Sequence, residues 1–293
     1  ASKASKPSEA ETVKVPLDAT APTPVPVSST ITLSQTLNAP ASTRPPPLHL
    51  PTRDPQTSFF SFHYNRGKAY INFYKTGLKA IFINRKLLTQ TAQTLQPPPG
   101  LKGTGGALDA TTTLQPTRAA MLLKERVRHD IGRVPIFGLM VFICGEFTPL
   151  LVLVFPKLTP YTCRIPAQVE KVRSNARQRR EASLHALRYV DLTDAMALDK
   201  VAPGHIARSL GLGGTMWDKI GMDVPFAPTR AARAVRKIVE DDFMIRRGGG
   251  VNGLEGEEAV LAAEARGIDV QGKSLKEVRH MLGSWIAKTT KGD

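Results

Sequence analysis

Residues 254–288 of the 293-residue chain read LEGEEAVLAAEARGIDVQGKSLKEVRHMLGSWIAK and predict a pair of helices. Ser274 followed by Glu277 forms a capping box, which is typical of a helix start. Behind it, apolar residues recur at the three- and four-residue intervals of one helix face: Leu275, Val278, Leu282 and Trp285 or Ile286. Gly267 lies where a left-handed C-terminal cap would end the preceding helix. We expect the two helices to form an antiparallel hairpin.

The helical period extends over the rest of residues 157–293. Long helices are predicted at 166–187, 228–245, 254–266 and 274–288, and shorter ones at 204–210 and 216–220. No convincing run shows the alternation of a half-buried strand. Glycine-rich stretches at 211–214 and 248–250 lack the Gly-Lys-Ser/Thr of a phosphate loop, so we interpret them as turns. The predicted fold class is all-α, with residues 157–293 as one helical domain.

Two basic runs in this domain are candidates for binding ribosomal RNA. The candidates are Lys171, Arg173, Arg177, Arg179, Arg180, Arg230, Arg233, Arg236 and Lys237. Arginines at three- and four-residue intervals can offer guanidinium groups to successive phosphates. A charged, solvated helix face is the ordinary alternative for either run. Two runs in one domain favour rRNA, a ribosome surface or anionic lipid headgroups as the partner.

Residues 134–155, VPIFGLMVFICGEFTPLLVLVF, predict a single transmembrane helix that follows a short helix in the region 117–156. Its 22 residues match a hydrocarbon core of about 30 Å at a rise of about 1.5 Å per residue. Fourteen of them are Val, Ile, Leu or Phe, which outweighs the cost of one carboxylate. The alternative is a buried core helix of a soluble domain.

Glu146 is the most unusual residue of this segment, because an ionisable group at membrane depth indicates a function. Pro149 has no N–H, so a continuing helix would leave the Gly145 carbonyl without its donor. The carboxylate and the freed carbonyl could form part of a cation or proton site. Alternatively, a protonated Glu146 hydrogen-bonds only a neighbouring helix or the opened backbone. One span cannot enclose an ion pathway, so transport would require a homo-oligomer.

Residues 59–95 predict a basic amphipathic helix with its core near 66–88. One face holds Tyr70, Phe73, Tyr74, Gly77 and Ile81. The cations are Arg66, Lys68, Lys75, Lys79, Arg85 and Lys86. With no acid between residues 55 and 108, this pattern suits a helix lying in an anionic membrane interface. We take all of these cations except Arg66 as lipid-binding candidates; a solvated face on an ordinary packed helix is the alternative.

Two further segments are predicted to lack a fold of their own. Residues 1–58 form a Pro/Ser/Thr-rich arm, with eleven of the 23 prolines before residue 56, and too little apolar area to offset the entropy of ordering. Residues 96–116 are rich in Pro, Gly and Thr and indicate a linker. The chain begins at Ala1 rather than Met, which leaves open whether a targeting peptide was removed.

Composition and motif content argue against an enzyme. The net charge of +15 favours an anionic partner, either nucleic acid or an anionic lipid surface. Two cysteines cannot build a disulfide framework, and the six histidines show no metal-binding spacing. No nucleophile, base and orienting acid stand out together. We therefore expect no catalytic residues, no metal and no cofactor.

Several short stretches together resemble the LETM-type family, the leucine-zipper, EF-hand-containing transmembrane proteins of the mitochondrial inner membrane. They are RVPIF at 133–137, EFTPL at 146–150, FPKLTPYT at 155–162, LAAEARG at 261–267 and LGSWI at 282–286, with residues 67–85 similar to the shorter fungal members. The sequence departs from that family in lacking an EF-hand loop and a long C-terminal coiled coil. It also has Ala263-Glu264 where Ala-Cys is expected, so it resembles a short relative.

The resemblance implies a single-pass mitochondrial inner-membrane protein with its C-terminal domain in the matrix, folded like a 14-3-3 helical array. Its partners would be the mitochondrial ribosome, through rRNA and ribosomal proteins, and the anionic lipids of the inner membrane. It would support membrane protein biogenesis and cation/proton homeostasis. Glu146 would take the family's intramembrane acidic position, with Pro135 and Pro149 as the flanking prolines. The alternatives are an oligomeric exchanger of K⁺ or Ca²⁺ against H⁺ through Glu146, and a lipid-binding scaffold.

Overall fold

The computed structural model describes residues 37–53, 58–94, 117–144, 158–191, 193–214, 217 and 222–290. The α-helices are α2 (Phe59–Thr94), α3 (Arg118–Ile131), α4 (Val134–Cys144), α6 (Pro166–Leu187), α7 (Ala195–Ser209), α9 (Ala227–Arg247), α10 (Gly256–Ala265) and α11 (Leu275–Thr289). Short 3₁₀ helices accompany them: η2 (Ala41–Thr43), η4 (Tyr161–Cys163) and η5 (Val251–Gly253). All regular structure in the described residues is helical, which confirms the all-α fold class.

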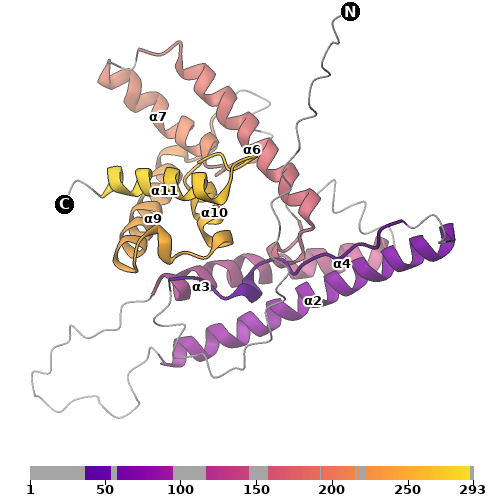
Figure 1. Cartoon of the computed structure of the whole chain (residues 1–293). Helices are drawn as coiled ribbons and strands as arrows, with labels where there is room; N and C mark the ends of the chain where they lie inside the picture. Colours follow the sequence, from indigo (N-terminus) through magenta and orange to yellow (C-terminus); the bar gives the residue numbers. More distant parts are fainter. Residues whose placement is uncertain are drawn as a thin grey trace, which may run out of the picture.

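The long helix α2 is the base of the N-terminal half (Figure 1). Helix α3 packs on its C-terminal part, where Leu123 and Val127 contact Leu87 and Leu88. Helix α4 continues along α2 toward its start and buries Phe137 completely in a cluster with Ile81. Helices α3 and α4 therefore run back along α2 in the opposite direction.

The 3₁₀ helix η4 passes over α2 and is held there by hydrogen bonds to the end of α3. The buried carboxylate of Asp130, at the end of α3, accepts the backbone N–H of Tyr161 at 2.7 Å and that of Thr162 at 3.3 Å. A Cβ at Gly77 would lie 2.7 Å from the carbonyl oxygen of Thr162 and 2.9 Å from Sγ of Cys163. Only a glycine in α2 leaves room for η4 at this distance.

The C-terminal half contains the hairpin of α10 and α11. The capping box of Ser274 and Glu277 is present, with a distance of 3.3 Å from the Glu277 N–H to Oγ of Ser274. Gly267 has φ +76°, and the N–H of Ile268 donates to the carbonyl of Ala263, as in a Schellman motif. The hairpin and α9 share one hydrophobic core, made by Ile245, Leu254, Ala259, Ala262, Leu282 and Ile286. These features confirm the predicted hairpin.

Buried ion pairs join the two halves. Arg126 of α3 makes a bidentate ion pair with the fully buried Glu258 of α10, with N–O distances of 2.7 and 2.9 Å. Arg118 of α3 binds Asp241 of α9 at 2.7 Å, and the same carboxylate accepts from Arg266 at 2.8 Å. These charges are desolvated and paired, so they fix the orientation of α3 against α9 and α10.

Part of the arm predicted to be disordered is ordered. Asn38 bonds the carbonyl of Gly253 at 2.9 Å and the N–H of Glu255 at 3.0 Å, and Arg44 pairs with Glu255 at 2.5 Å. Leu37 packs on the core of the C-terminal half. Composition does not reveal this order, because the segment has no hydrophobic core of its own. It is held instead by a few specific contacts to the surface of the C-terminal half. Residues 1–36, 54–57 and the predicted linker at 96–116 lie outside the described residues.

The predicted transmembrane helix is not confirmed. Helix α4 covers Val134–Cys144, and the rest of the 22-residue segment, including Glu146 and Pro149, lies outside the described residues. Among the helices that the structure describes, none has both the length and the apolar character needed to cross a bilayer. One face of α4 is instead used to pack on α2, which hydropathy alone could not reveal. Of the short helix predicted at 216–220, only Trp217 is described.

Candidate functional site

The outward face of α2 carries two parallel rows of side chains. The apolar row consists of Phe60, Tyr64, Ile71 and Phe82, all strongly exposed, with Phe60 at 82 %. The basic row consists of Lys68, Lys75, Lys79 and Lys86, which are also exposed. Successive members are four, seven and eleven residues apart in the first row and seven, four and seven in the second. At about 3.6 residues per turn, such separations keep side chains on one line.

The two rows lie next to each other because three lysines follow an apolar residue by four positions. The pairs are Tyr64 with Lys68, Ile71 with Lys75, and Phe82 with Lys86. The buried face of the same helix, with Phe73, Gly77 and Ile81, points toward α3, α4 and η4. Arg85, another predicted lipid-binding residue, is also exposed and lies one helical turn after Phe82 of the apolar row. The structure thus places all five predicted lipid-binding residues on the exposed surface of α2.

Helix α4 adds an uncharged exposed surface beside α2. Its sequence, VPIFGLMVFIC, holds no ionisable side chain apart from Cys144. Ile136, Leu139, Phe142 and Ile143 are exposed, and Phe142 is 87 % exposed. The rings of Phe137 and Tyr74 lie 5.7 Å apart and hold α4 against α2. We refer to the exposed apolar residues of both helices, together with the basic row, as the α2/α4 surface.

Two ionisable groups buried under the α2/α4 surface, the Cys163 thiol and the Tyr74 phenol, have raised pKa values. Burial raises the pKa of the Cys163 thiol to about 12, with the nearby Asp130 a smaller contribution in the same direction. Burial also raises the pKa of the Tyr74 phenol well above its usual value. Both groups are therefore uncharged near neutral pH, and Cys163 is a packing residue with little thiolate character. The lysines of the basic row, by contrast, are exposed on the outside of α2.

The predicted RNA-binding residues do not form one surface. They lie on α6 and α9, which stand on different sides of the α10–α11 hairpin in Figure 1. Arg173 pairs with Glu264, Arg177 with Glu181 at 2.8 Å, and Lys237 with Glu125 at 2.8 Å. These acids lie on other helices or one turn further along the same helix. The runs of cations in the sequence therefore overstate the positive charge that is left unpaired on the surface.

The remaining RNA-binding candidates differ in exposure. Lys171 is exposed on α6, while Arg179 and Arg180 are partly buried near the turns at Gly211 and Gly267. Arg230 is exposed and donates to the carbonyl of Leu212 at 3.3 Å. Arg233 and Arg236 are exposed on α9. Binding of RNA or ribosomes therefore has its best candidates on α9.

The predicted intramembrane site is only partly described. Pro135 lies exposed in the first turn of α4, where proline fits a helix. Glu146 and Pro149 lie outside the described residues, so the cation or proton site stays a prediction. Throughout the described part of the chain, no group of three or more His, Cys, Asp or Glu side chains is arranged to hold a metal ion.

Sequence reasoning missed two features of this arrangement. The apolar row on α2 was visible as a spacing pattern, but Phe60, Tyr64, Ile71 and Phe82 fall outside the face chosen as apolar. The ion pairs between α3 and the C-terminal half join residues more than 120 positions apart, as in Arg118 with Asp241 and Arg126 with Glu258. No local signal in one sequence marks such pairs.

Comparison with known proteins gives one family match. A family model described as PNT1, the pentamidine resistance factor domain, matches residues 103–200, which is about a third of the chain. This range contains α3, α4, η4, α6 and the start of α7, but not α2. No curated protein and no solved structure matched the chain.

The match corrects the family assignment made from the sequence. The family found is not the LETM-type family, so that resemblance is wrong. It rested on short apolar segments with prolines and on a helical hairpin, and features this short recur in unrelated helical proteins. The 14-3-3-like array and the topology implied by the resemblance lose that support. Over residues 103–200, this chain is similar to the pentamidine resistance factor domain.

Proposed function

We propose that the protein binds an anionic membrane through the α2/α4 surface and thereby holds its C-terminal helices at that membrane. The observation that carries the proposal is the pair of rows on α2. Exposed aromatic and aliphatic side chains lie beside lysines along one helix. A helix in a membrane interface buries such apolar side chains at the acyl boundary, while the lysines reach anionic headgroups.

The arrangement of α4 on α2 favours a position in the interface over a crossing. Helix α4, described over Val134–Cys144, packs along α2 through one face. Its buried face meets α2 around Tyr74 and Ile81, the part of α2 that also exposes Lys75 and Lys79. Each ammonium group at mid-bilayer would cost about 2.5–3.5 kcal/mol. Lying flat avoids this cost.

The mitochondrial inner membrane is the membrane that we propose. The family of the matched domain is a mitochondrial one, which supports this location for the present chain. A +15 net charge and a lysine row suit a membrane rich in anionic lipid. Binding of mitochondrial ribosomes by Arg233 and Arg236 stays a second proposal, which salt-sensitive co-sedimentation with these ribosomes would test; absence of binding at low salt would argue against it.

Flotation with vesicles tests the membrane proposal. The full chain should float with phosphatidylcholine vesicles that contain cardiolipin, and much less with phosphatidylcholine alone. The double variant Lys75→Gln/Lys79→Gln removes two lysines from the basic row. At about 1 kcal/mol for each lysine near an anionic surface, its partition coefficient should fall about 30-fold.

The matched control removes the same charge elsewhere. Lys200 of α7 and Lys288 of α11 are exposed and lie on other helices. The variant Lys200→Gln/Lys288→Gln should float nearly as well as the unsubstituted chain. An equal loss in both double variants would mean that net charge alone drives binding, and the α2/α4 surface would lose its role.

A further inference from the structure

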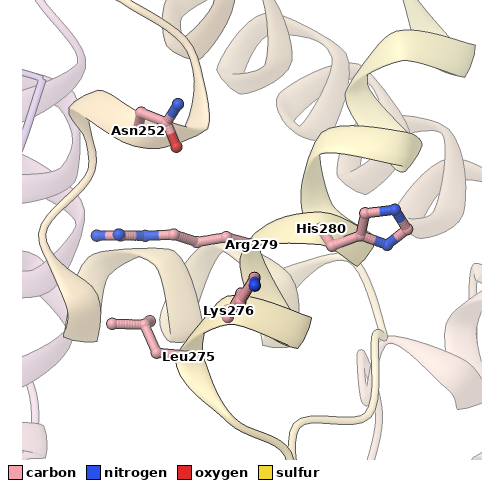
Figure 2. A pocket seen from close by; sticks show the side chains of 5 residues that line it. All are labelled: Asn252, Leu275, Lys276, Arg279 and His280. Carbon is pink, nitrogen blue, oxygen red and sulfur yellow. The ribbon is translucent and has the colours of Figure 1, made fainter.

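A hollow of about 470 Å³ is lined by residues of η5 and α11. These residues are Asn252, Leu275, Lys276, Arg279 and His280. Figure 2 shows the Arg279 side chain extending between Asn252 and Leu275, with Lys276 beside it and the His280 ring directed to the other side. The hollow is open to solvent rather than enclosed.

The guanidinium of Arg279 is held in place by a hydrogen bond but keeps N–H donors for a ligand. One terminal nitrogen, Nη2, donates to the carbonyl of Leu254 at 3.0 Å, which fixes the guanidinium against η5. Its Nε is buried beyond the reach of a ligand and has no hydrogen-bond acceptor among the described residues. The donors available to a ligand are therefore the remaining N–H groups of the two terminal nitrogens. An arginine fixed by a backbone carbonyl, with donors left over, is prepared to bind an oxyanion at little cost in side-chain entropy.

The charge around the hollow is positive. Lys276 lies one helical turn before Arg279 and is exposed, so its ammonium group can reach the same ligand. None of the lining residues is an acid. The acids of the adjoining segments are engaged elsewhere: Glu277 caps Ser274 and Glu255 pairs with Arg44.

A guanidinium, an ammonium and a carboxamide around one hollow match the chemistry of a phosphate group. Arginine and lysine give charge-assisted hydrogen bonds to phosphate oxygens, and the amide of Asn252 can add a neutral donor. We propose that this hollow binds a phosphate group, supplied by a lipid headgroup or by a soluble phosphate compound. The site is made by η5 and α11, so it is separate from the α2/α4 surface and does not depend on membrane binding.

Calorimetric titration of the full chain with inorganic pyrophosphate tests the site. We expect saturable binding that weakens at least about tenfold in Arg279→Gln, because a hydrogen bond to a charged group is lost. Arg279 also holds Leu254, so a second variant, Lys276→Gln, removes an exposed charge without touching that contact. It should weaken binding several-fold with unchanged unfolding temperature. The control is Lys200→Gln, which removes an exposed charge from α7.

The outcomes distinguish a lipid headgroup from a soluble compound as the source of the phosphate, and they decide whether the proposal holds. If pyrophosphate binds and Lys276→Gln also lowers flotation on cardiolipin vesicles in the Lys75→Gln/Lys79→Gln background, the source is a lipid headgroup. If pyrophosphate binds and flotation does not change, the source is a soluble phosphate compound. Absence of saturable pyrophosphate binding, or an equal weakening in Lys200→Gln, would overturn the site.

Discussion

Gly77 is the residue of α2 over which η4 passes. A methyl group there would enter the space of the Thr162 carbonyl and of the Cys163 sulfur. Cys163 is completely buried with Ile81 and Phe137, so the neighbours of Gly77 have no room to retreat. From the sequence, Gly77 is recognisable as a member of the buried face of α2. A glycine is needed at this position because η4, about 85 positions away, passes close to it, and the sequence does not show that contact.

Gly77→Ala should therefore destabilise the fold by about 1–3 kcal/mol, the usual cost of overpacking. Gly67 lies in the same helix, and a Cβ there meets no atom within 4 Å. Gly67→Ala should instead be neutral or stabilising by up to about 1 kcal/mol, because alanine favours the helix. Urea unfolding of both variants measures the difference. If the two variants have the same midpoint, the tight crossing of α2 and η4 is contradicted.

At the scale of elements, the buried ion pairs decide how α3 meets the C-terminal helices. Glu258 is fully buried in the first turn of α10, and Arg126 of α3 binds both of its oxygens. The hydroxyl of Thr43 accepts from the same arginine at 2.8 Å, so η2 belongs to this junction as well. The network thus ties the ordered part of the N-terminal arm, α3 and α10 together.

Removal of one partner of a buried pair leaves the other charge desolvated and unpaired. Glu258→Gln should therefore lower the free energy of unfolding by about 3–5 kcal/mol. The matched control is Glu125→Gln, which breaks an exposed pair between α3 and α9 at 2.8 Å and should cost no more than about 1 kcal/mol. Equal losses in urea unfolding would show that the buried pair does not hold the junction.

Local signals predicted some elements well and others poorly. The sequence places α6 at its observed bounds and the α10–α11 hairpin within two residues, because caps and apolar stripes are local. It shortens α7, whose observed start at Ala195 follows the cap of Asp194 and whose interior contains Pro203. It also reads α4 as part of a bilayer span. Apolar length cannot distinguish a bilayer from a neighbouring helix such as α2.

At the scale of the whole molecule, α2 exposes both apolar and basic side chains and α4 exposes apolar ones, while the C-terminal helices satisfy many of their charges internally. The junction of α3 with α9 and α10 makes the two halves one body. If membrane binding through the α2/α4 surface is correct, the C-terminal helices would be held beside the membrane. Fold class was predictable from the sequence, but this division of surfaces required the packing of α4 on α2.

The most direct test of membrane binding measures the depth of two side chains in the bilayer. Tryptophan replaces Phe60 or Phe142, and the unsubstituted chain corrects for Trp217 and Trp285. Fluorescence is then recorded on cardiolipin vesicles whose phosphatidylcholine is brominated near the headgroup or near the bilayer centre. We predict strong quenching at both positions by the bromines nearer the headgroup. Absence of quenching at both positions, or strongest quenching of position 142 at the bilayer centre, would contradict an α2/α4 surface lying in the membrane interface.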